Sequence, residues 1–512
     1  MAIAEFEELK YKSNGLYQKL HKKKSKSIIF RHGHIAITDY KMGDNFEFEK
    51  SLSTWDKMSF KYHLIGGYYV KDLKEFRVNR GYDHRLLKRF FPNYAMAVDN
   101  VSYPADKINV DLYAEPRNDF QRVGMTFMAS KGNYGGNAKF TQQLVTAPPG
   151  EGKTYLGVTS SAFLSARTVV IVPFSKLLKQ WKQSFIEFTS IPEDEIMIVQ
   201  GSKECQKIID GKCKKIKVFI FMVDTIASFQ EREGDLAVID MLRATNAYTK
   251  IVDEVHKDMK ALSMIEALSN FKMNYYMSAS PGRTESKENW IFNSLFYNVP
   301  KFGSDFRKDD EKHINVMVKK YQFTPTSQQI GRMVNPKVGL NTRSYEKELI
   351  YAREEQRESF DNSLRVMLKW SKGLLIKGNK ILILAQTVSF IEYIQKIAEE
   401  IFPEKTALYH GQMKPSEKEE ALKATVIIAT AGSLGTGADI KGLQHCYNCM
   451  TYAGKIDALQ ISGRLRKLPD EKTQTIYIEM LNAGWLKTIR QYEKRKPHLI
   501  KISKTGKIIV ID

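Results

Sequence analysis

The chain has 512 residues and a formal net charge of +21, and its length exceeds what one hydrophobic core usually serves. Hydrophobic residues make up 43% and charged residues 27%, which excludes a collagen, a disulfide scaffold and a wholly disordered chain. The four cysteines favour a reducing compartment, and we find neither a spanning apolar run nor a secretory signal core. The positive charge favours a polyanionic partner: nucleic acid, with an anionic membrane as the alternative.

The first 105 residues are predicted to form a separate small α+β domain. Residues 1–110 contain 20 Lys and Arg against 13 Asp and Glu. A basic cluster opens the segment 21–37 and runs into strand-like sequence; it is a candidate DNA contact, and a solvated charged face is the alternative. Apolar and polar residues alternate over 60–78 around Gly66 and Gly67, which predicts a hairpin turning at these glycines.

From about residue 140 the pattern predicts two α/β lobes. Apolar runs rich in β-branched residues alternate with helical stretches, which is typical of parallel sheets buried on both faces. The candidate strands are 167–173, 217–223, 250–254, 273–280, 380–386, 406–411, 424–432 and 474–481. We place the lobes at 106–302 and 303–482, with a loop at 325–345, a helical stretch at 346–377 and a basic C-terminal tail at 483–512.

A phosphate-binding loop is predicted at 147–154, between a strand-like and a helix-like segment. Its glycines let backbone N–H groups turn inward around phosphate oxygens, and the following helix N-terminus adds its dipole. Lys153 supplies a cation for the β- and γ-phosphates, and Thr154 offers a hydroxyl to Mg²⁺. The predicted nucleotide contacts of this loop are Pro149, Gly150, Glu151, Gly152, Lys153 and Thr154.

An apolar strand that ends in Asp253 and Glu254 predicts the hydrolytic centre. Asp253 is a candidate ligand of Mg²⁺, and Glu254 is a candidate for polarising the attacking water. An acidic pair alone is weak evidence, but here it follows a phosphate-binding loop on a separate strand. His256 is a candidate for coupling the nucleotide state to the next strand, with a surface histidine as the alternative.

Motifs in both predicted lobes resemble those of superfamily-two helicases over about residues 115–470. In the first lobe these are an adenine-reading motif, two strand-contacting motifs and a coupling motif: Glu115-Pro116 with Phe120-Gln121, Pro173-Phe174-Ser175 with Gln180-Trp181, Val223-Asp224-Thr225, and Ser278-Ala279-Ser280 with Gly282-Arg283. In the second lobe they are Ile383–Gln386, Tyr409-His410-Gly411, Thr430-Ala431-Gly432 with Gly435–Asp439, and Gln460 with Gly463-Arg464.

The resemblance implies two tandem RecA-like lobes that use ATP and Mg²⁺ to move along nucleic acid. It implies nucleotide contacts by Phe120, Gln121, Gly437, Asp439 and Arg464. It implies nucleic-acid contacts by Pro173, Ser175, Thr225, Gln386, His410, Gly411, Thr430 and Ala431. The expected catalytic residues are Lys153, Asp253, Glu254, Arg464 and Lys467.

Within the superfamily the sequence is most similar to UvsW-type phage recombination helicases. The similarity lies in the adenine motif, in the segment TGADIKGL (436–443) and in QISGRLRK (460–467). It implies an enzyme that acts on branched DNA in recombination, replication or repair, with residues 1–105 as an accessory DNA-binding domain. It also implies a cytoplasmic location, in a bacterial host if the protein is phage-encoded. We expect the enzyme to be a monomer.

The sixth motif departs from the family pattern at its second arginine. Lys467 occupies that position, and Arg466 stands beside it. Arginine offers phosphate a planar fork, whereas lysine is a point charge. The sequence leaves open whether Arg466 has taken over this role or Arg464 serves alone.

Several alternatives stay open. An RNA helicase and the motor subunit of a restriction system fit the same motifs, and so does a nucleic-acid-binding protein with a degenerate ATPase. Cys446 and Cys449 form an isolated CxxC, which we interpret as two small residues on a strand and not as a metal site. Trp485 precedes a basic segment that suits DNA contact; a terminal helix packed by this tryptophan is the alternative.

Overall fold

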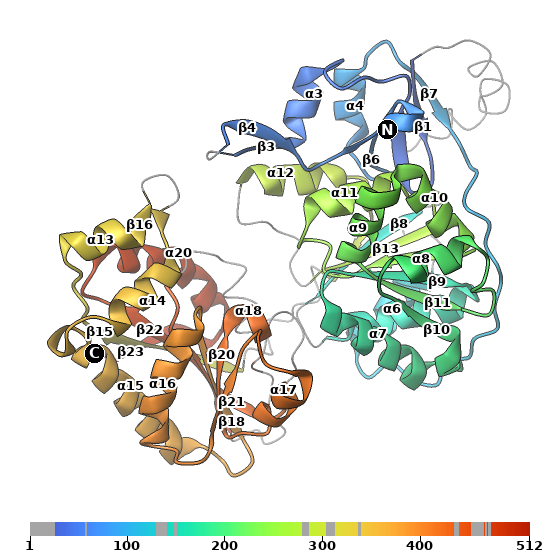
Figure 1. The fold of residues 1–512 in the computed structure, drawn as a ribbon. Coiled ribbons are helices and arrows are strands. Elements are labelled where there is room, and N and C mark those ends of the chain that lie inside the picture. The colour runs from blue at the N-terminus through green and yellow to red at the C-terminus, as the bar shows by residue number, and fades with distance from the viewer. Residues whose placement is uncertain are drawn as a thin grey trace. The chain divides into compact units, whose positions relative to one another are not determined.

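The computed structural model describes residues 26–56, 59–129, 141–147, 151–278, 286–303, 313–335, 339–434, 440–451, 465, 468 and 473–511. The chain divides into two compact units, Met1–Arg307 and Lys308–Asp512 (Figure 1). No helix in these ranges is both long and apolar enough to span a bilayer.

The first unit opens with a five-stranded sheet in the order β5-β6-β2-β1-β7. Its pairs are antiparallel except β1 with β7. Two short helices accompany it, and a separate two-stranded ribbon is formed by β3 and β4. The bounds are β1 Ser27–Phe30, β2 His34–Ile37, α3 Phe46–Ser51, β3 Ser53–Asp56, β4 Lys61–Leu64, β5 Tyr68–Val70, β6 Glu75–Asn79, α4 His84–Phe90 and β7 Ala95–Val98.

The hairpin expected at Gly66 and Gly67 is wrong. The strands on either side of these glycines belong to different sheets, since β4 pairs with β3 and β5 pairs with β6. A Cβ atom on Gly66 would lie 2.6 Å from the Ile291 side chain, and one on Gly67 would lie 2.6 Å from the Phe76 ring. The two glycines therefore allow close packing of the connection and do not mark a turn.

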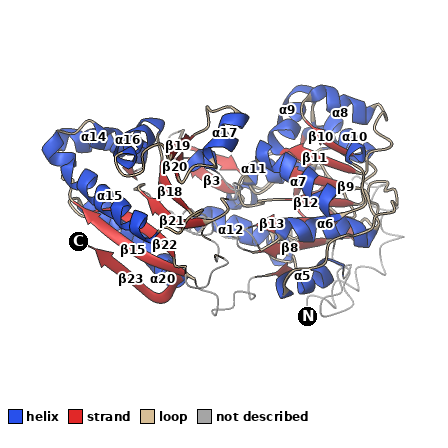
Figure 2. Cartoon of the chain, turned by 90° about the horizontal axis from the view of Figure 1, so that it is seen from below, coloured by secondary structure: helices blue, strands red, loops and turns tan. Residues whose placement is uncertain are grey.

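The rest of the first unit is a seven-stranded parallel sheet in the order β10-β11-β9-β12-β13-β8-β14. Figure 2 shows its strands between layers of helices. The strands are β8 Gln142–Thr146, β9 Thr168–Val172, β10 Ile196–Val199, β11 Val218–Met222, β12 Thr249–Val252, β13 Met273–Ser278 and β14 Lys301–Phe302. The helices are α5 Asp119–Ala129, α6 Lys153–Leu164, α7 Ser175–Phe188, α8 Ser202–Ile209, α9 Val223–Glu233, α10 Asp235–Ala244, α11 Met259–Ala267 and α12 Ser286–Leu295.

Continuous apolar strands form here because both faces of the sheet are buried. Along β9, Val169 and Ile171 join one hydrophobic core, and Val170 and Val172 join the other. The core that contains Val169 also includes residues of the N-terminal sheet, such as Phe76. The N-terminal sheet therefore packs into the same hydrophobic core as the parallel sheet of the first unit.

Buried polar contacts fix the N-terminal sheet to the end of α11 and to the segment that follows this helix. Arg77 donates to the backbone oxygen of Ala267 at 2.6 Å, and His34 Nδ1 lies 3.0 Å from the backbone oxygen of Ser269. A Cβ atom on Gly33 would lie 2.4 Å from that same oxygen, so only glycine permits this approach.

A buried ion pair stands behind this junction. Lys250, on β12, donates to Glu266 at 2.5 Å, and the two side chains are 0% and 1% exposed. Glu266 also accepts from the Tyr276 hydroxyl at 2.6 Å and from Asn79 of the N-terminal sheet at 3.4 Å. The network joins the N-terminal sheet to β12, the strand that precedes Asp253.

The second unit holds another seven-stranded parallel sheet, in the order β19-β20-β18-β21-β22-β15-β23. Its strands are β15 Ile314–Tyr321, β18 Lys380–Ala385, β19 Thr406–Tyr409, β20 Val426–Thr430, β21 Leu443–Asn448, β22 Thr475–Asn482 and β23 Ser503–Ile511. Its helices are α13 Ser327–Met333, α14 Thr342–Ile350, α15 Glu354–Leu374, α16 Val388–Glu399, α17 Pro415–Ala421, α18 Ala431–Leu434 and α20 Leu486–Ile502. The expected fold class, two parallel α/β lobes with a small N-terminal domain, is confirmed.

Two local expectations in this unit are wrong. The predicted loop at 325–345 contains α13, begun by a capping box of Thr326 and Gln329, then the short pair β16 Val334–Asn335 with β17 Gly339–Leu340, and the start of α14. The predicted tail at 483–512 forms α20 and β23, and β23 pairs with β15. Arg495 is buried against Glu479, so part of the basic composition serves packing and not solvation.

Trp485 packs a C-terminal helix, which was the alternative to a DNA contact. It stands at the N-cap of α20, and its ring stacks on Tyr345 with centroids 6.2 Å apart and planes 4° from parallel. Of the CxxC pair, Cys446 lies on β21 and Cys449 directly follows this strand, and both side chains are buried. Within the described ranges, no group of three metal-ligating side chains occurs.

We expect Glu266→Gln to destabilise the first unit by about 3–5 kcal/mol, since it leaves Lys250 as an unpaired buried charge. Chemical denaturation of the full chain measures this loss. The matched control is Asp240→Asn, which removes an exposed partner of Arg243 and should cost at most about 1 kcal/mol. Equal midpoints for the two variants would contradict the role of the network.

Candidate nucleotide and nucleic-acid site

The phosphate-binding loop ends at α6, which begins at Lys153. Gly152 has φ +95°, a conformation that favours glycine, and a Cβ atom there would lie 2.0 Å from Gln121 Nε2. Lys153 is buried, and its ammonium donates to the backbone oxygen of Ala147 at 2.7 Å. Thr154 follows in the first helical turn and is half-buried. The helix N-terminus, the lysine and the hydroxyl form the arrangement that phosphate binding requires.

Two residues of the predicted adenine motif, Gln121 and Phe120, lie in different surroundings. Gln121 is buried against the loop: its oxygen accepts from the backbone N–H of Arg117 at 2.8 Å, and its Nε2 is 3.5 Å from the backbone oxygen of Glu151. Phe120 packs instead on Phe302, with ring centroids 5.2 Å apart, and is 7% exposed. The structure therefore places Gln121 at the loop and Phe120 in the core beneath it.

Asp253 and Glu254 come together with Lys153. Burial lowers the pKa of the Lys153 ammonium, against the opposing charges of Glu254 and Asp253. Burial also raises the pKa of the Asp253 carboxyl, against the Trp181 hydrogen bond and the charge of Lys153. Both acidic residues are 8% exposed. The strand order brings the loop after β8 and the acidic pair after β12 to the same carboxyl edge, with only β13 between them.

Trp181 has a different position from the one its motif suggests. The predicted strand-contacting motif includes it, but Trp181 is 0% exposed and points from α7 into the hydrophobic core beside Gly157 of α6. Its indole N–H donates to Asp253 Oδ2 at 3.0 Å, and the backbone N–H of Glu254 donates to Oδ1 at 2.8 Å. Both carboxylate oxygens of Asp253 are thereby oriented, and sequence reasoning missed this donor because 72 residues separate the partners.

A short polar chain leads from Glu254 to the next strand. Glu254 has φ +48°, and its Oε2 lies 3.2 Å from His256 Nδ1, which is 2.9 Å from the hydroxyl of Ser278. His256 is buried, so the surface alternative is wrong. Ser278 ends β13 and begins the predicted coupling motif.

The predicted nucleic-acid contacts of the first unit lie at the carboxyl ends of two neighbouring strands. Pro173 and Ser175 follow β9, and Thr225 is in the first turn of α9, directly after β11. Ser175 is exposed, and Pro173 and Thr225 are half-buried. The carboxyl edge therefore carries nucleotide candidates after β8 and β12 and nucleic-acid candidates after β9 and β11.

The second unit repeats this placement on β19, β20 and β18, which are adjacent. Gln386 follows β18, His410 and Gly411 follow β19, and Thr430 with Ala431 ends β20 and starts α18. The Thr430 hydroxyl is 2.7 Å from that of Ser433, which donates to the backbone oxygen of Tyr409 at 3.1 Å. These bonds tie the ends of β19 and β20 together.

Other predicted site residues lie outside the described ranges. They are Pro149, Gly150, Gly437, Asp439, Arg464 and Lys467, together with Arg466. The loop glycine and the whole of the sixth motif's cationic group therefore stay predictions.

Glu346 is a buried residue that sequence reasoning missed. It lies on α14, and its carboxylate accepts from the backbone N–H groups of Gln386 and Thr387 at 2.7 and 2.8 Å and from the Thr387 hydroxyl at 2.7 Å. It thereby holds the connection from β18 to α16, where Gln386 lies. Burial raises the pKa of Glu346 to about 7, against these hydrogen bonds.

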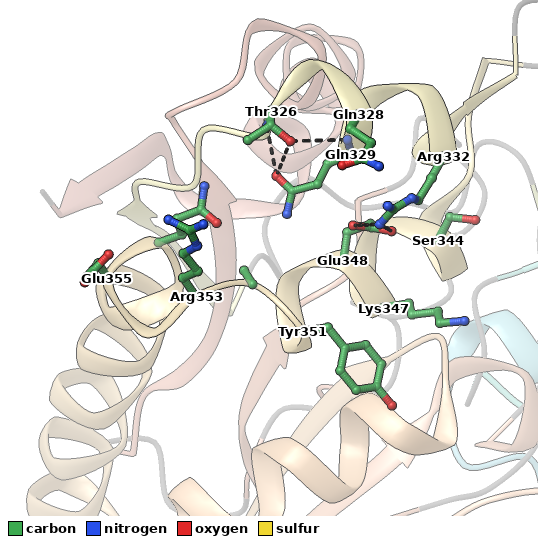
Figure 3. A pocket seen from close by; sticks show the side chains of 12 residues that line it. Thr326, Gln328, Gln329, Arg332, Ser344, Lys347, Glu348, Tyr351, Arg353 and Glu355 are labelled. Carbon is green, nitrogen blue, oxygen red and sulfur yellow. Dashed lines mark hydrogen bonds and ion pairs between the residues drawn. The ribbon is translucent and has the colours of Figure 1, made fainter.

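An open polar groove of about 940 Å³ lies between α13, α14 and the start of α15 (Figure 3). Figure 3 shows the Arg332–Glu348 ion pair, at 3.3 Å, on one of its walls. None of the predicted site residues lines this groove.

Two family models match the chain, one on each lobe. The model described as "Type III restriction enzyme, res subunit" matches residues 108–283, and "Helicase conserved C-terminal domain" matches residues 363–468. Their ranges enclose the phosphate-binding loop, the acidic pair and the sixth motif. The chain thus carries the paired domains of superfamily-two helicases.

Curated relatives match part of the chain. A putative DNA 3'-5' helicase Rad25 of Haloarcula marismortui is 26% identical over 33% of this chain and 25% of its own length. The helicase/translocase subunit XPB/SSL2 of general transcription and DNA repair factor IIH of Saccharomyces cerevisiae is 25% identical over 24% of this chain and 14% of its own length. The chain therefore spans a quarter or less of these relatives. Among solved structures, S. cerevisiae Dbp5 bound to RNA and ADP BeF3 is 11% identical, with TM-score 0.48, over 77% of this chain and 89% of that chain.

We expect the stability of the second unit to depend on Glu346 and pH. Because its folded pKa is raised, its contribution is full below the unfolded value near 4.5 and is lost as pH rises through about 7. A difference of one between the folded and unfolded pKa values corresponds to about 1.4 kcal/mol of unfolding free energy. Denaturation at pH 5 and pH 8 should show a smaller loss of stability for Glu346→Gln than for the wild type. The same loss in both proteins would contradict the assignment.

Proposed function

Because the chain carries both helicase domains of superfamily two, we propose that it is an ATP-dependent DNA helicase or translocase. The observation that carries the proposal is the convergence of buried Lys153, Asp253 and Glu254 at the carboxyl edge of one parallel sheet. This edge is where ligands bind in open α/β sheets.

The residues fit ATP and Mg²⁺. Backbone N–H groups at the start of α6 and the Lys153 ammonium would hold the phosphates, and Thr154 and Asp253 would hold the metal. Mg²⁺ supplies charge that neutralises the phosphate oxygens. Asp253 is suited to this because two N–H donors fix its oxygens while leaving it beside Lys153.

Glu254 is proposed to orient the attacking water and accept its proton. Its contact with His256, and that of His256 with Ser278, would transmit the state of the site to the segment after β13. From the family pattern, Arg464 is proposed to stabilise charge on the transferring phosphoryl group, with Arg466 or Lys467 as a second cation.

DNA is the proposed polymer because the curated relatives are named as DNA helicases or as subunits of a DNA repair factor. The candidates after β9, β11, β18, β19 and β20 would contact the backbone, which gives little sequence preference. The similarity to UvsW-type helicases supports a finer proposal: branched DNA as substrate, in recombination or repair of phage DNA. The match to a restriction-enzyme subunit supports a second candidate, the motor of a restriction system.

The test is ATP hydrolysis by the full chain with single-stranded DNA, forked DNA or single-stranded RNA. We expect DNA to stimulate turnover more than RNA, and forked DNA to stimulate it most. Lys153→Ala should abolish hydrolysis but keep DNA binding. Glu254→Gln should keep ATP binding and lose turnover by roughly 100-fold or more. Stimulation by RNA alone would exclude DNA as the polymer, and normal hydrolysis by Glu254→Gln would remove that residue from the mechanism.

A second prediction concerns Trp181 as a positioning residue. Trp181→Phe removes the N–H donor of Asp253, so the pKa of Asp253 should rise further and the acid limb of the kcat–pH profile should move to higher pH. Trp370→Phe, in the second unit, is the control and should leave the profile in place. If both variants keep the wild-type profile, the indole hydrogen bond has no role in turnover.

A further inference from the structure

The β3–β4 ribbon carries aromatic rings that face solvent. Trp55 and Tyr62 stand opposite each other in its register, with ring centroids 4.8 Å apart, and are 48% and 44% exposed. Phe46, on α3, lies edge-on to Tyr62 at 6.4 Å and is 57% exposed. Figure 1 shows the ribbon extending from the N-terminal sheet with α12 beside it.

Helix α12, which packs beside β3, extends the same surface. Trp290 is 41% exposed, and the Lys287 ammonium stands over its ring, 4.7 Å from the centroid. The Lys50 ammonium lies 5.7 Å from the Phe46 ring and 5.8 Å from the Tyr62 ring. We call Phe46, Lys50, Trp55, Tyr62, Lys287 and Trp290 the aromatic patch.

The charges that lie on the rings of this patch are positive. Partial burial lowers the pKa of Lys287, and the charge of Lys50 lowers it further, so the two ammonium groups repel each other. Two carboxylates of α3 lie nearby: Glu49 accepts from the Tyr40 hydroxyl and the Gly43 backbone N–H, and the exposed Glu47 lies 4.0 Å from the Lys50 ammonium. A phosphate at the patch could replace this exposed carboxylate beside Lys50 and would reduce the repulsion between Lys50 and Lys287.

Stability of the ribbon does not explain the patch. A cross-strand pair such as Trp55 and Tyr62 does stabilise a two-stranded ribbon. It does not require further exposed rings on two separate helices, α3 and α12. Ten aromatic side chains are markedly exposed in the described ranges, and five of them lie on this ribbon and these helices: Phe46, Trp55, Phe60, Tyr62 and Trp290. Such gathering of exposed apolar surface marks an interaction site.

We infer that the aromatic patch binds the unpaired bases of single-stranded DNA. Flat rings offer stacking surfaces to bases of any sequence, and neighbouring lysines neutralise the backbone phosphates. Duplex DNA keeps the faces of its bases covered by their neighbours, so the patch discriminates separated strands from paired ones. The inference rests on the proposed function and names the part of the first unit that would hold a strand once it is separated.

The test uses the full chain and measures fluorescence anisotropy of a labelled thymidine oligomer and of a blunt duplex of equal length. Trp55→Thr keeps a strand-forming residue but removes the ring, and should weaken oligomer binding between about 5- and 100-fold. Trp55→Phe keeps the ring and should bind within about twofold of the wild type. Duplex binding should be the same for all three proteins. Tyr113→Thr, which removes an exposed ring elsewhere in the first unit, should change neither.

Two further variants keep the inference testable if Trp55→Thr disturbs the ribbon. Trp290→Leu changes α12 only and should also weaken oligomer binding. Lys50→Gln should reduce the slope of log affinity against log salt by roughly 0.7, the value for one phosphate contact on a single strand.

The outcomes separate the two proposals. If the wild type binds no DNA and no nucleic acid stimulates its ATPase, the proposed function fails. If the wild type binds the oligomer and Trp55→Thr and Trp290→Leu bind it equally well, the aromatic patch is not a strand-binding surface, and docking of a protein becomes the explanation for its exposure.

Discussion

The first unit depends on a buried cation and a buried carboxylate that share one edge of a parallel sheet. Lys153 and Asp253 are each costly to bury, and each offsets part of the other's desolvation. The remaining lone pairs of Asp253 are directed by Trp181 and by the backbone of Glu254. Such a pair is a poor source of stability but a good means of holding charges ready for a polyanionic ligand. Burial of apolar side chains in the surrounding hydrophobic cores offsets the desolvation cost of this buried pair.

The strands and the order of the motifs were predictable because their signals are local. A strand buried on both faces is apolar over most of its length, as the runs Val169–Val172 of β9, Val218–Met222 of β11, Ile381–Ala385 of β18 and Val426–Ala429 of β20 are. A phosphate-binding loop needs small residues at fixed spacing, and the acidic pair needs a strand before it. Both requirements concern residues that are close together in the sequence. The sequence alone therefore predicted Lys153 and Asp253 in the same lobe.

The features that sequence reasoning missed depend on residues far away in the chain. Gly66 resembles a turn glycine, but its role is set by Ile291. Trp181 resembles part of a surface motif, but its donor is aimed at Asp253. The basic composition of 483–512 suggested a tail, but β23 is the edge strand of the second sheet and pairs with β15. Charge and pattern cannot show such partners, because several tertiary arrangements satisfy the same local sequence.

The N-terminal sheet is connected to the candidate hydrolytic site through β12. Lys250 and Asp253 are three positions apart along one extended segment: the first is held by the network that includes Asn79, and the second begins the acidic pair. Packed cores transmit displacement because they are nearly incompressible. The hydrogen-bond network and the shared hydrophobic core join the N-terminal sheet directly to β12. The ribbon and the acidic pair both belong to the first compact unit, so a strand bound at the ribbon would be held by the same unit in which ATP is proposed to be hydrolysed.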